Sequence, residues 1–435
     1  MKITNPQIDI ELIKQQTLAD TQRCVMCGMC SAHCPTYELS QDENESPRGR
    51  IALIQSLLSG RIQSSPSIEK HLDNCLMCRS CETICPSKVP YSDILAFGRH
   101  YIESQKTPPA KQGYKQTLGL WLITQNHKIQ QLAWLIKLYQ RSGLQRLVRK
   151  TRILRLLELT PLGLARLERL IPSASRLSKP HPASSRPKND HEQNISLFTG
   201  CLSPIFDQQT LQASKNILES CGYSVNIPKN QTCCGAIHAH NGDQKTAGKC
   251  AQRNIDAFTQ HPSNKIIYSA TGCGASLSAY QKEHPSISKV EVFDNNLADI
   301  LGFLSRESAL KNIKFSALDK KVMIHRPCLS RNILKITDQA ETLLSNIPML
   351  DIHLAQSKTI CCGAAGSHMI SHPEHAQSIR EKLLAEIIAV KPDILVSDNL
   401  GCVLHIQQGL RSKGLDIEVM HPVVLLERQI SLNLD

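Results

Sequence analysis

Hydrophobic and polar positions follow two periods along this chain, and the carboxyl-terminal half alternates between them. Short β-branched runs there are separated by stretches whose apolar residues have helical spacing. The runs read ISLFTG, KIIYSA, VMIH and DILVSD, and the helical stretches include QTLQASKNILES and SIREKLLAEIIAV. This alternation is typical of strand–helix units, so it predicts an α/β fold with a mostly parallel sheet.

The strand–helix region contains an internal repeat. Four pairs of segments match in order: SLFTGCLSP (196–204) with VMIHRPCLS (322–330), TCCGAIHAH (232–240) with ICCGAAGSH (360–368), IIYSATGCGASL (266–277) with ILVSDNLGCVLH (394–405), and VEVFD (290–294) with IEVMH (417–421). Matches in register over this length indicate a duplication. We therefore expect two repeated domains, over residues 191–310 and 311–435.

Two other parts precede the repeats. Residues 1–106 contain eight cysteines in two runs. Residues 107–190 contain no cysteine, are rich in Leu, Lys and Arg, and end in the Pro- and Ser-rich PSASRLSKPHPASSRPKND (172–190). That composition predicts a helical segment followed by an exposed linker.

Composition narrows the class of protein. The 435 residues are 41% hydrophobic and 20% charged, as in globular proteins. No signal segment opens the sequence, and apolar stretches such as LGLWLI (118–123) are too short to span a bilayer, so we expect a cytoplasmic protein. Eighteen cysteines in a reducing compartment indicate metal ligands or redox chemistry rather than disulfides.

The positive charge belongs to one segment. Residues 111–188 hold sixteen Lys and Arg against two acidic residues, while the whole chain has a net charge of +12. Because the rest of the chain is close to neutral, we expect no nucleic-acid partner. Leu, Ile and Trp at helical spacing within 120–170 allow two interpretations: helices that pack on the amino-terminal part, or an amphipathic surface for an anionic membrane or a partner.

The amino-terminal cysteines follow a pattern with specific chemistry. CVMCGMCSAHCP (24–35) and CLMCRSCETICP (75–86) both read C-x₂-C-x₂-C-x₃-C-P, which is typical of a ferredoxin-like module with two 4Fe–4S clusters. In this pattern the fourth cysteine of each run ligates the other cluster. The expected ligands are Cys24, Cys27, Cys30 and Cys85 for one cluster, and Cys75, Cys78, Cys81 and Cys34 for the second. Zinc is the alternative metal, but it needs only four ligands.

The segment between the two runs predicts a helix. ESPRGRIALIQSLLSG (45–60) places Ser46 as the N-cap, Pro47 in the first turn and Gly60 at the carboxyl end. The helix is expected to pack beside the clusters. Arg48 and Arg50 offer a second interpretation, in which the helix is a docking surface.

Each repeat also contributes four cysteines, the complement of one further iron–sulfur cluster. They are Cys201, Cys233, Cys234 and Cys273 in the first repeat, and Cys328, Cys361, Cys362 and Cys402 in the second. The outer two of each set follow predicted strands, at the edge where open α/β sheets bind ligands. Burial as ordinary apolar side chains is the alternative, and it suits Cys221 and Cys250, which have no counterpart in the second repeat.

These motifs, in this order, resemble the iron–sulfur subunit of glycolate oxidase (glycolate dehydrogenase). The resemblance covers nearly the whole chain and includes ESPRGRIALI, HLDNCLMCRSCETICPSKVPY, NIDAF, TGCGAS and CCGAAGSH. It implies an electron-transfer subunit without substrate catalysis of its own, which passes electrons from an FAD-bearing partner subunit toward quinone as glycolate is oxidised to glyoxylate. The chain itself has no dinucleotide fingerprint, since TGCGAS is not GxGxxG.

Related families leave alternatives open. The same motifs occur in subunits of lactate and anaerobic glycerol-3-phosphate dehydrogenases, and in heterodisulfide reductase. The repeat of that last enzyme ends in CxxC, whereas Ser276 and His405 occupy the final position here, which argues against disulfide reduction. His405 is either a replacement ligand or a structural residue. His240, His368 and His421 are candidates for tuning a cluster by hydrogen bonds.

Overall fold

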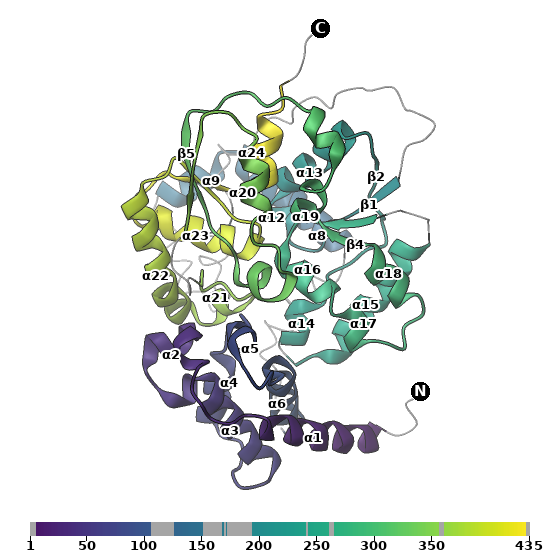
Figure 1. Ribbon diagram of the computed structural model, residues 1–435, viewed down its shortest axis with the longest axis vertical. Coiled ribbons are helices and arrows are strands. Elements are labelled where there is room, and N and C mark those ends of the chain that lie inside the picture. Colours follow the sequence, from purple (N-terminus) through teal and green to yellow (C-terminus); the bar gives the residue numbers. More distant parts are fainter. Residues whose placement is uncertain are drawn as a thin grey trace.

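The computed structural model describes residues 6–105, 126–150, 168, 171, 194–240, 242–260, 265–355 and 361–431. Figure 1 shows a helical amino-terminal block against one end of a larger body, which contains two parallel sheets. The expected combination of a helical ferredoxin-like part with two α/β repeats therefore agrees with the described elements. The predicted linker 172–190 lies outside the described residues.

The amino-terminal block consists of helices around two cysteine loops. Its elements are α1 (Pro6–Gln22), η1 (Ser31–His33), α2 (Pro35–Ser40), η2 (Glu43–Glu45), α3 (Pro47–Leu58), α4 (Pro66–Asp73), α5 (Ser80–Ile84) and α6 (Tyr91–Gln105). Helices α3 and α6 cross closely at Gly98, where a Cβ would lie only 2.8 Å from the side chain of Ile54. This crossing forms the core of the block, together with Leu57, Leu72 and Leu95.

The helix predicted between the cysteine runs is confirmed as α3. The Ser46 hydroxyl accepts a hydrogen bond from the Gly49 amide at 2.9 Å, and Pro47 occupies the first turn. Gly60 follows the last turn with φ 73°, a left-handed conformation that glycine adopts without strain. The cap and the stop signal therefore act as the sequence predicts.

The first repeat is built on a parallel sheet of β1 (Asn194–Phe198), β2 (Ser224–Asn226), β3 (Lys265–Tyr268) and β4 (Leu297–Asp299), in the order β2-β1-β3-β4. Its helices are α12 (Ser203–Phe206), α13 (Gln208–Ser220), α14 (Ala236–His240), α15 (Gln244–Thr259), α16 (Thr271–Leu277), α17 (Tyr280–Glu283), α18 (Val290–Asn296) and α19 (Ile300–Leu304). The short turn η4 (Ser308–Asn312) leads to the second repeat.

The second repeat has the same topology. Its parallel strands are β5 (Lys320–Ile324), β6 (Leu350–Leu354), β7 (Ile394–Val396) and β8 (Glu418–Met420), in the order β6-β5-β7-β8. Its helical elements are η5 (Ser330–Leu334), α20 (Gln339–Leu344), α21 (His368–Ser371), α22 (Pro373–Val390), α23 (Leu400–Ser412) and α24 (Pro422–Arg428). The identical strand order supports the duplication, and the four predicted strands correspond to β1, β3, β5 and β7.

One predicted match between the repeats is wrong. VEVFD was paired with IEVMH, but residues 290–296 form helix α18, whereas 418–420 form strand β8. Ile266 pairs with Leu297 and Ile394 with Glu418, so the true counterpart of β8 is β4, which begins after α18 at Leu297. Val290 and Phe293 lie one helical turn apart, so both face the core from helix α18.

The two repeats form one body with a common core. Buried strand residues such as Leu197 and Ile267 belong to the same apolar cluster as Val322 and Val396. Helix α13 packs against α24 across the boundary. The loops that follow β3 and β7 are joined directly, since the Thr271 amide donates to the Asp398 carbonyl at 3.1 Å. The carboxyl ends of both sheets therefore meet near the middle of the molecule.

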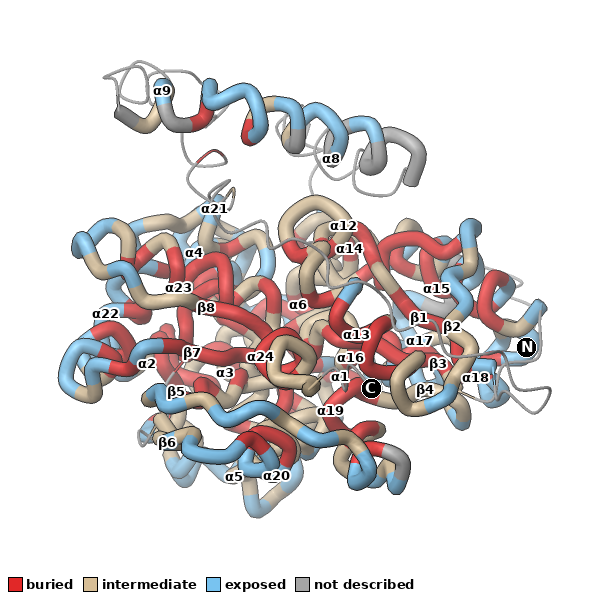
Figure 2. The backbone as a smooth tube through the Cα atoms, turned by 90° about the horizontal axis from the view of Figure 1, so that it is seen from above, coloured by how far each residue is buried: buried red, intermediate tan, exposed pale blue. Residues whose placement is uncertain are grey.

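Part of the basic segment is described as α8 (Asn126–Arg141) and α9 (Leu144–Lys150). Figure 2 shows these helices along one side of the body. The expected packing partner is wrong for α8, whose main contact is α12 of the first repeat rather than the amino-terminal block. None of the described helices is both long enough and apolar enough to cross a membrane.

Candidate functional site

The eight amino-terminal cysteines form two groups in space. One cavity is lined by Cys24, Cys27 and Cys30 of the first loop and by Cys81 and Cys85 of the second. A second cavity is lined by Cys34, Cys75, Cys78 and Cys81. Each cavity draws cysteines from both loops, which agrees with two clusters that exchange their fourth ligands, and Cys81 lines both cavities. Which cysteines bind which cluster stays a prediction.

Arg48 holds the first cysteine loop. Its guanidinium donates to the Met26 carbonyl at 3.0 Å and forms an ion pair with Glu43 at 2.5 Å. A Cβ on Gly28, which has φ 81°, would lie 2.6 Å from the same guanidinium, so glycine is needed at this position. Arg48 therefore positions the backbone of the first cysteine loop. The interpretation of Arg48 as part of a docking surface did not anticipate this role.

Arg50 is a core residue, and its interpretation as a docking surface is wrong. The side chain is completely buried and forms an ion pair with Glu45. Its Nε also donates to the His71 carbonyl at 2.7 Å. The remaining oxygen of Glu45 accepts hydrogen bonds from Asn74 at 2.9 Å and His71 at 2.7 Å. This network ties η2, α3 and α4 together directly behind the second cysteine cavity.

The second cysteine loop is largely half-buried, with Leu76 and Cys81 buried, and it is hydrogen-bonded. The Tyr91 hydroxyl donates to the Cys75 sulfur at 3.4 Å. Burial raises the pKa of the Cys78 thiol to about 12 and raises the pKa of Cys81 well above its usual range. Thiols with such pKa values stay protonated at neutral pH, so metal binding here must displace protons.

In the first repeat, four thiols lie in a continuous row. The Cys201 sulfur is 3.6 Å from the Cys233 sulfur. Cys233 contacts its neighbour Cys234, and Cys234 contacts Cys273. Cys201 follows β1 and Cys273 follows β3, so the strand ends hold the outer members of the row while the adjacent pair fills the middle.

The second repeat forms the same row. Cys328 contacts Cys361, Cys361 contacts Cys362, and Cys362 contacts Cys402. Contact with Cys361, together with burial, raises the pKa of the Cys328 thiol well above its usual range. The structure thus brings together all four candidate cysteines of each repeat.

The glycine that follows each cysteine pair has a defined role. The Gly235 amide donates to the Cys233 sulfur at 3.4 Å, and the Gly363 amide donates to the Cys361 sulfur at 3.4 Å. Both glycines are left-handed, with φ 86° and 76°. This turn directs an amide toward a sulfur, an interaction that favours the thiolate form.

Sequence reasoning gave no role in holding the first cysteine pair to several residues that do so, although Ser276 and the NIDAF motif, which begins with Asn254, were both noted. Asn254 donates to the Cys233 carbonyl at 3.0 Å, and its side-chain oxygen accepts from the Thr232 amide at 2.8 Å. Tyr280 and Ser276 each donate to the Cys234 carbonyl at 2.9 Å. Asn254 and Tyr280 come from helices α15 and α17, outside the matched segments, so the repeat carried no signal for them.

His405 acts as a hydrogen-bonding residue in the second repeat. Its Nε2 donates to the Ala376 carbonyl at 3.2 Å, and its Nδ1 lies 3.2 Å from an Arg380 guanidinium nitrogen. Burial, aided by Arg380, lowers the pKa of His405 to about 4. Both ring nitrogens are therefore engaged away from the cysteines, which favours the structural interpretation over the ligand one.

The other three candidate histidines differ in their surroundings. Both nitrogens of His421 are used by backbone groups: Nδ1 accepts from the Val423 amide and Nε2 donates to the Ser269 carbonyl at 2.9 Å. His240 lies close enough to Cys234 to interact with its charge, although burial lowers the pKa of His240 to about 4. His368 pairs with His375 at 2.8 Å. Tuning of a cluster by any of them stays a prediction.

The amino-terminal block meets the second repeat at a cysteine. The Asn332 side-chain amide donates to the Cys78 carbonyl at 2.7 Å and to the Ser80 hydroxyl at 2.9 Å. Cys78 also lies near enough to Cys328 and Cys361 for their charges to interact. The second amino-terminal cavity and the cysteine row of the second repeat are therefore direct neighbours.

The donor chemistry of these groups fits iron–sulfur clusters. All four groups consist of cysteine sulfur, and thiolates are the usual ligands of such clusters. Among the described residues, no three His, Cys, Asp or Glu side chains are placed to hold a single metal ion.

Comparisons with known proteins agree with this arrangement. The family model of a 4Fe-4S dicluster domain matches residues 20–89, the model of the linker region of the glycolate oxidase iron-sulfur subunit matches 112–171, and that of a cysteine-rich domain matches 195–278 and 322–407. A probable glycolate oxidase iron-sulfur subunit from Bacillus subtilis is 31% identical over 95% of this chain and 94% of its own length. The glycolate oxidase iron-sulfur subunit of Escherichia coli is 30% identical over 94% and 93%. Lactate utilization protein A 2 of Bacillus cereus is 27% identical but covers 54% of this chain.

Proposed function

The chain belongs to the glycolate oxidase iron–sulfur subunit family, and from this we propose that it transfers electrons within an FAD-dependent 2-hydroxy-acid dehydrogenase that oxidises glycolate to glyoxylate. Flavoprotein partner subunits bind FAD and the substrate, and the electrons leave toward a quinone. This chain performs no substrate catalysis of its own. The four-part division at 1–106, 107–190, 191–310 and 311–435 is part of the proposal.

The proposed ligands are the cysteines that line each group. Two 4Fe–4S clusters would be held in the amino-terminal block, by Cys24, Cys27, Cys30 and Cys85 and by Cys75, Cys78, Cys81 and Cys34. Further clusters would be held by the rows Cys201, Cys233, Cys234 and Cys273 and Cys328, Cys361, Cys362 and Cys402. When bound, such clusters supply one-electron oxidation and reduction.

The observation that carries the proposal is that the cysteine groups lie next to one another in space. Cys81 lines both amino-terminal cavities, and Cys78 neighbours Cys328 in the second repeat. Three of the four groups therefore form a continuous series. A series of one-electron carriers is what a protein needs to connect a flavin with a distant acceptor.

The protein side chains around the second cavity would adjust its potential. The buried Arg50 lies close enough to Cys34 and Cys75 for their charges to interact, and Tyr91 donates to the Cys75 sulfur. A fixed positive charge and hydrogen bonds to sulfur favour the reduced, more negative state of a cluster.

We also propose that the protein is cytoplasmic and lies against the inner face of the membrane through α8 and α9. Large apolar side chains are exposed there: Trp134 (62%), Leu135 (53%), Leu138 (52%), Leu144 (48%) and Leu147 (55%). They belong to the segment that carries most of the positive charge. An exposed apolar stripe with a Trp in a basic segment suits an anionic lipid surface.

Iron content and electron flow test the electron-transfer proposal together. Cys78→Ala and Cys27→Ala should each remove about four irons per chain, as one 4Fe–4S cluster contains. Each should leave flavin reduction by glycolate intact and stop reduction of quinone by the assembled complex. Cys221→Ala, directly after α13 and without a counterpart in the second repeat, is the matched control and should change neither the iron content nor the electron flow. Full electron flow in a protein that has lost a cluster would exclude the relay role.

Lactate is the second candidate substrate, because lactate utilization protein A 2 matches about half of the chain at 27% identity. The assembled complex should be assayed with glycolate and lactate side by side. A higher kcat/KM for lactate would move the proposal to a lactate dehydrogenase without changing the role of this chain.

A further inference from the structure

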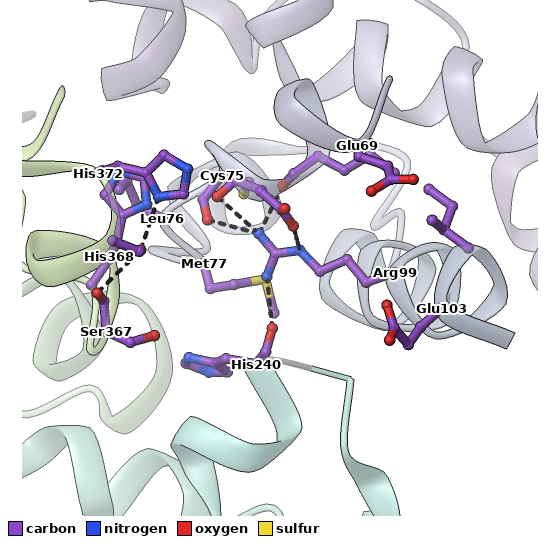
Figure 3. Close-up of a pocket in the computed structure, with 15 residues that line it drawn as sticks. Glu69, Cys75, Leu76, Met77, Arg99, Glu103, His240, Ser367, His368 and His372 are labelled. Carbon is purple, nitrogen blue, oxygen red and sulfur yellow. Dashed lines mark hydrogen bonds and ion pairs between the residues drawn. The ribbon is translucent and has the colours of Figure 1, made fainter. Parts of the chain in front are cut away.

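A cavity of about 290 Å³ lies where the amino-terminal block meets both repeats. Figure 3 shows its walls: Cys75, Met77 and Arg99 from the amino-terminal block, His240 from the first repeat, and His368 and His372 from the second. The volume is near the lower end of the range for small-molecule sites, about 300 to 1,000 Å³. Cys75 is a proposed cluster ligand and His240 and His368 are candidate tuning residues, but no role described above fills the cavity itself.

The cavity lies beside two of the cysteine groups. Cys75, a proposed ligand of the second cluster, forms part of its wall, as do its neighbours Leu76 and Met77. Leu76 packs against Cys361 of the second repeat, beside Ala365, another wall residue. A molecule bound here would therefore lie within a few side chains of both groups.

Arg99 holds the walls together. Its guanidinium donates to the carbonyls of Leu72 at 2.7 Å, Cys75 at 3.1 Å and His240 at 3.3 Å. Most of its hydrogen-bonding capacity is thus used by the backbone, as the dashed lines in Figure 3 show. The cavity has a frame that is formed before any ligand arrives, which lowers the entropic cost of binding.

The wall from the second repeat is a histidine cluster. The rings of His368 and His372 stack with centroids 4.7 Å apart, and His368 Nε2 is 2.8 Å from His375 Nδ1. Burial lowers the pKa of His368 to about 3, so its ring is neutral at pH 7. Neutral imidazoles offer N–H donors to a carbonyl oxygen without adding charge.

The charges of the walls disfavour an anionic ligand. Glu69, Asp73 and Glu103 line the cavity, and Arg99 is the cationic residue among them. A 2-hydroxy acid carries a carboxylate that these side chains would repel. The remaining surface includes the apolar Leu72 and Met77, and a thioether packs well against the edge of an aromatic or quinonoid ring.

We propose that this cavity binds the head group of a quinone and is where the electrons leave the protein. The inference rests on the proposed function and adds the position of its acceptor site. Each quinone would take two electrons, supplied one at a time by the clusters that the neighbouring cysteine groups would hold, and two protons from water at the cavity mouth, and would leave as the quinol. The ring lies against Met77, and a histidine of the second repeat donates to a carbonyl oxygen.

Two variants test the site in the assembled complex. Ser371→Trp places an indole at the mouth, where Ser371 is exposed, and His372→Leu keeps the volume but removes a hydrogen-bonding ring. Each should lower the rate of reduction of a short-chain benzoquinone by about tenfold or more. Ferricyanide, which takes electrons at the protein surface, should be reduced at the original rate. Ser378→Trp, an exposed position on α22 outside the cavity, is the control.

Direct labelling gives a readout that does not depend on turnover. A photoactivated azido-benzoquinone should label residues 367–372 and 75–77, and Ser371→Trp should abolish the label. Labelling elsewhere, or quinone reduction that both variants leave unchanged while the clusters are still reduced, would overturn the site and leave the relay proposal intact. Clusters that are never reduced by the flavin partner would instead overturn the relay proposal itself. Comparing short-chain and membrane-embedded quinones shows whether the acceptor arrives from water or from lipid.

Discussion

The glycine after each cysteine pair shows how a single residue controls a site. Gly363 has φ 76°, and a Cβ there would lie 2.3 Å from the Ala376 carbonyl oxygen on the helix behind it. At Gly235 the nearest atoms, on Ala247, are 3.3 Å away. The two repeats share the motif, but the second repeat is packed more tightly around it.

Gly363→Ala should therefore destabilise the second repeat by more than the backbone strain of an alanine in the left-handed region. Strain at one such position costs about 1 kcal/mol, and a backbone clash that forces α22 away adds to it. We expect a loss of at least about 2 kcal/mol in the free energy of unfolding, measured by urea denaturation. Gly366→Ala, with φ 61° and open space around its Cβ position, is the control and should show only the strain. Equal losses would contradict the clash.

His421 makes the junction of the repeats sensitive to acid. It caps α24 and donates to Ser269 of the first repeat, and burial lowers its pKa to about 4. Because the folded pKa lies below the unfolded value of about 6.5, this contribution is complete above that pH and is lost as the pH falls toward 4. The full effect is on the order of 3 kcal/mol.

Replacement by a neutral cap tests this dependence. His421→Asn keeps an acceptor for the Val423 amide but cannot titrate. The midpoint of thermal unfolding should fall less between pH 7 and pH 5 in His421→Asn than in the original protein. Parallel curves would show that other groups cause the acid sensitivity.

At the scale of elements, the buried Arg50–Glu45 pair joins three of them. Glu45 ends η2, Arg50 lies on α3, and His71, whose carbonyl accepts from Arg50, lies on α4. Of these elements α3 lines the second cysteine cavity directly, through Pro47 and Arg50. The position of the ligand loop therefore depends on a polar core rather than on apolar packing alone.

Arg50→Met should remove this support. It leaves Glu45 buried without its cation, which typically costs about 3 to 5 kcal/mol. We expect a lower unfolding midpoint and the loss of about four irons from the second site. Arg48→Met is the matched control on the same helix, since Arg48 is one-third exposed, and it should cost far less stability. Replacing Glu45 by Leu as well should restore part of the loss, and a double variant no better than Arg50→Met would contradict the unpaired-charge explanation.

At the scale of the whole molecule, the amino-terminal block is connected to the second repeat by polar contacts. Asn332 binds the backbone of the second cysteine loop, and the exposed ion pair Lys382–Glu38 joins α22 to α2. A second exposed pair, Lys282–Asp93, joins the block to α17 of the first repeat instead. Exposed pairs contribute little and are screened by salt. Among the polar contacts, Asn332 is therefore the one that we expect to matter most for how closely the two cysteine groups approach, beside the apolar packing of Leu76 against Cys361.

Asn332→Leu should loosen this junction without unfolding either part. Backbone amides of residues 75–81 should exchange hydrogen faster by about fivefold, which corresponds to a lost hydrogen bond of about 1 kcal/mol. Asn346→Leu, an exposed site at the end of α20, is the control. Unchanged exchange in residues 75–81 would show that the junction is held by other contacts.

The sequence predicted the local features well. The four main strands, helix α3 with its caps and the strand-end positions of Cys201, Cys273, Cys328 and Cys402 follow from periodicity and capping, which depend on neighbouring residues. The match of 290–294 with 417–421 failed because both segments are short and apolar, and strand pairing alone distinguishes a helix from a strand there. Arg50 was misjudged because an arginine in a sequence gives no indication of a buried partner.

By itself, the sequence determined which chemical groups this protein can offer, because cysteine spacing and duplication are properties of the chain. Only the tertiary structure decided which groups meet: the row of thiols in each repeat, the contact of Cys78 with the second repeat, and the cavity framed by Arg99. Each of these joins residues that are far apart in sequence, and their proximity depends on how sheets and helices pack into one core. Side-chain packing of that kind leaves no periodic pattern and no motif in the sequence from which it could be predicted.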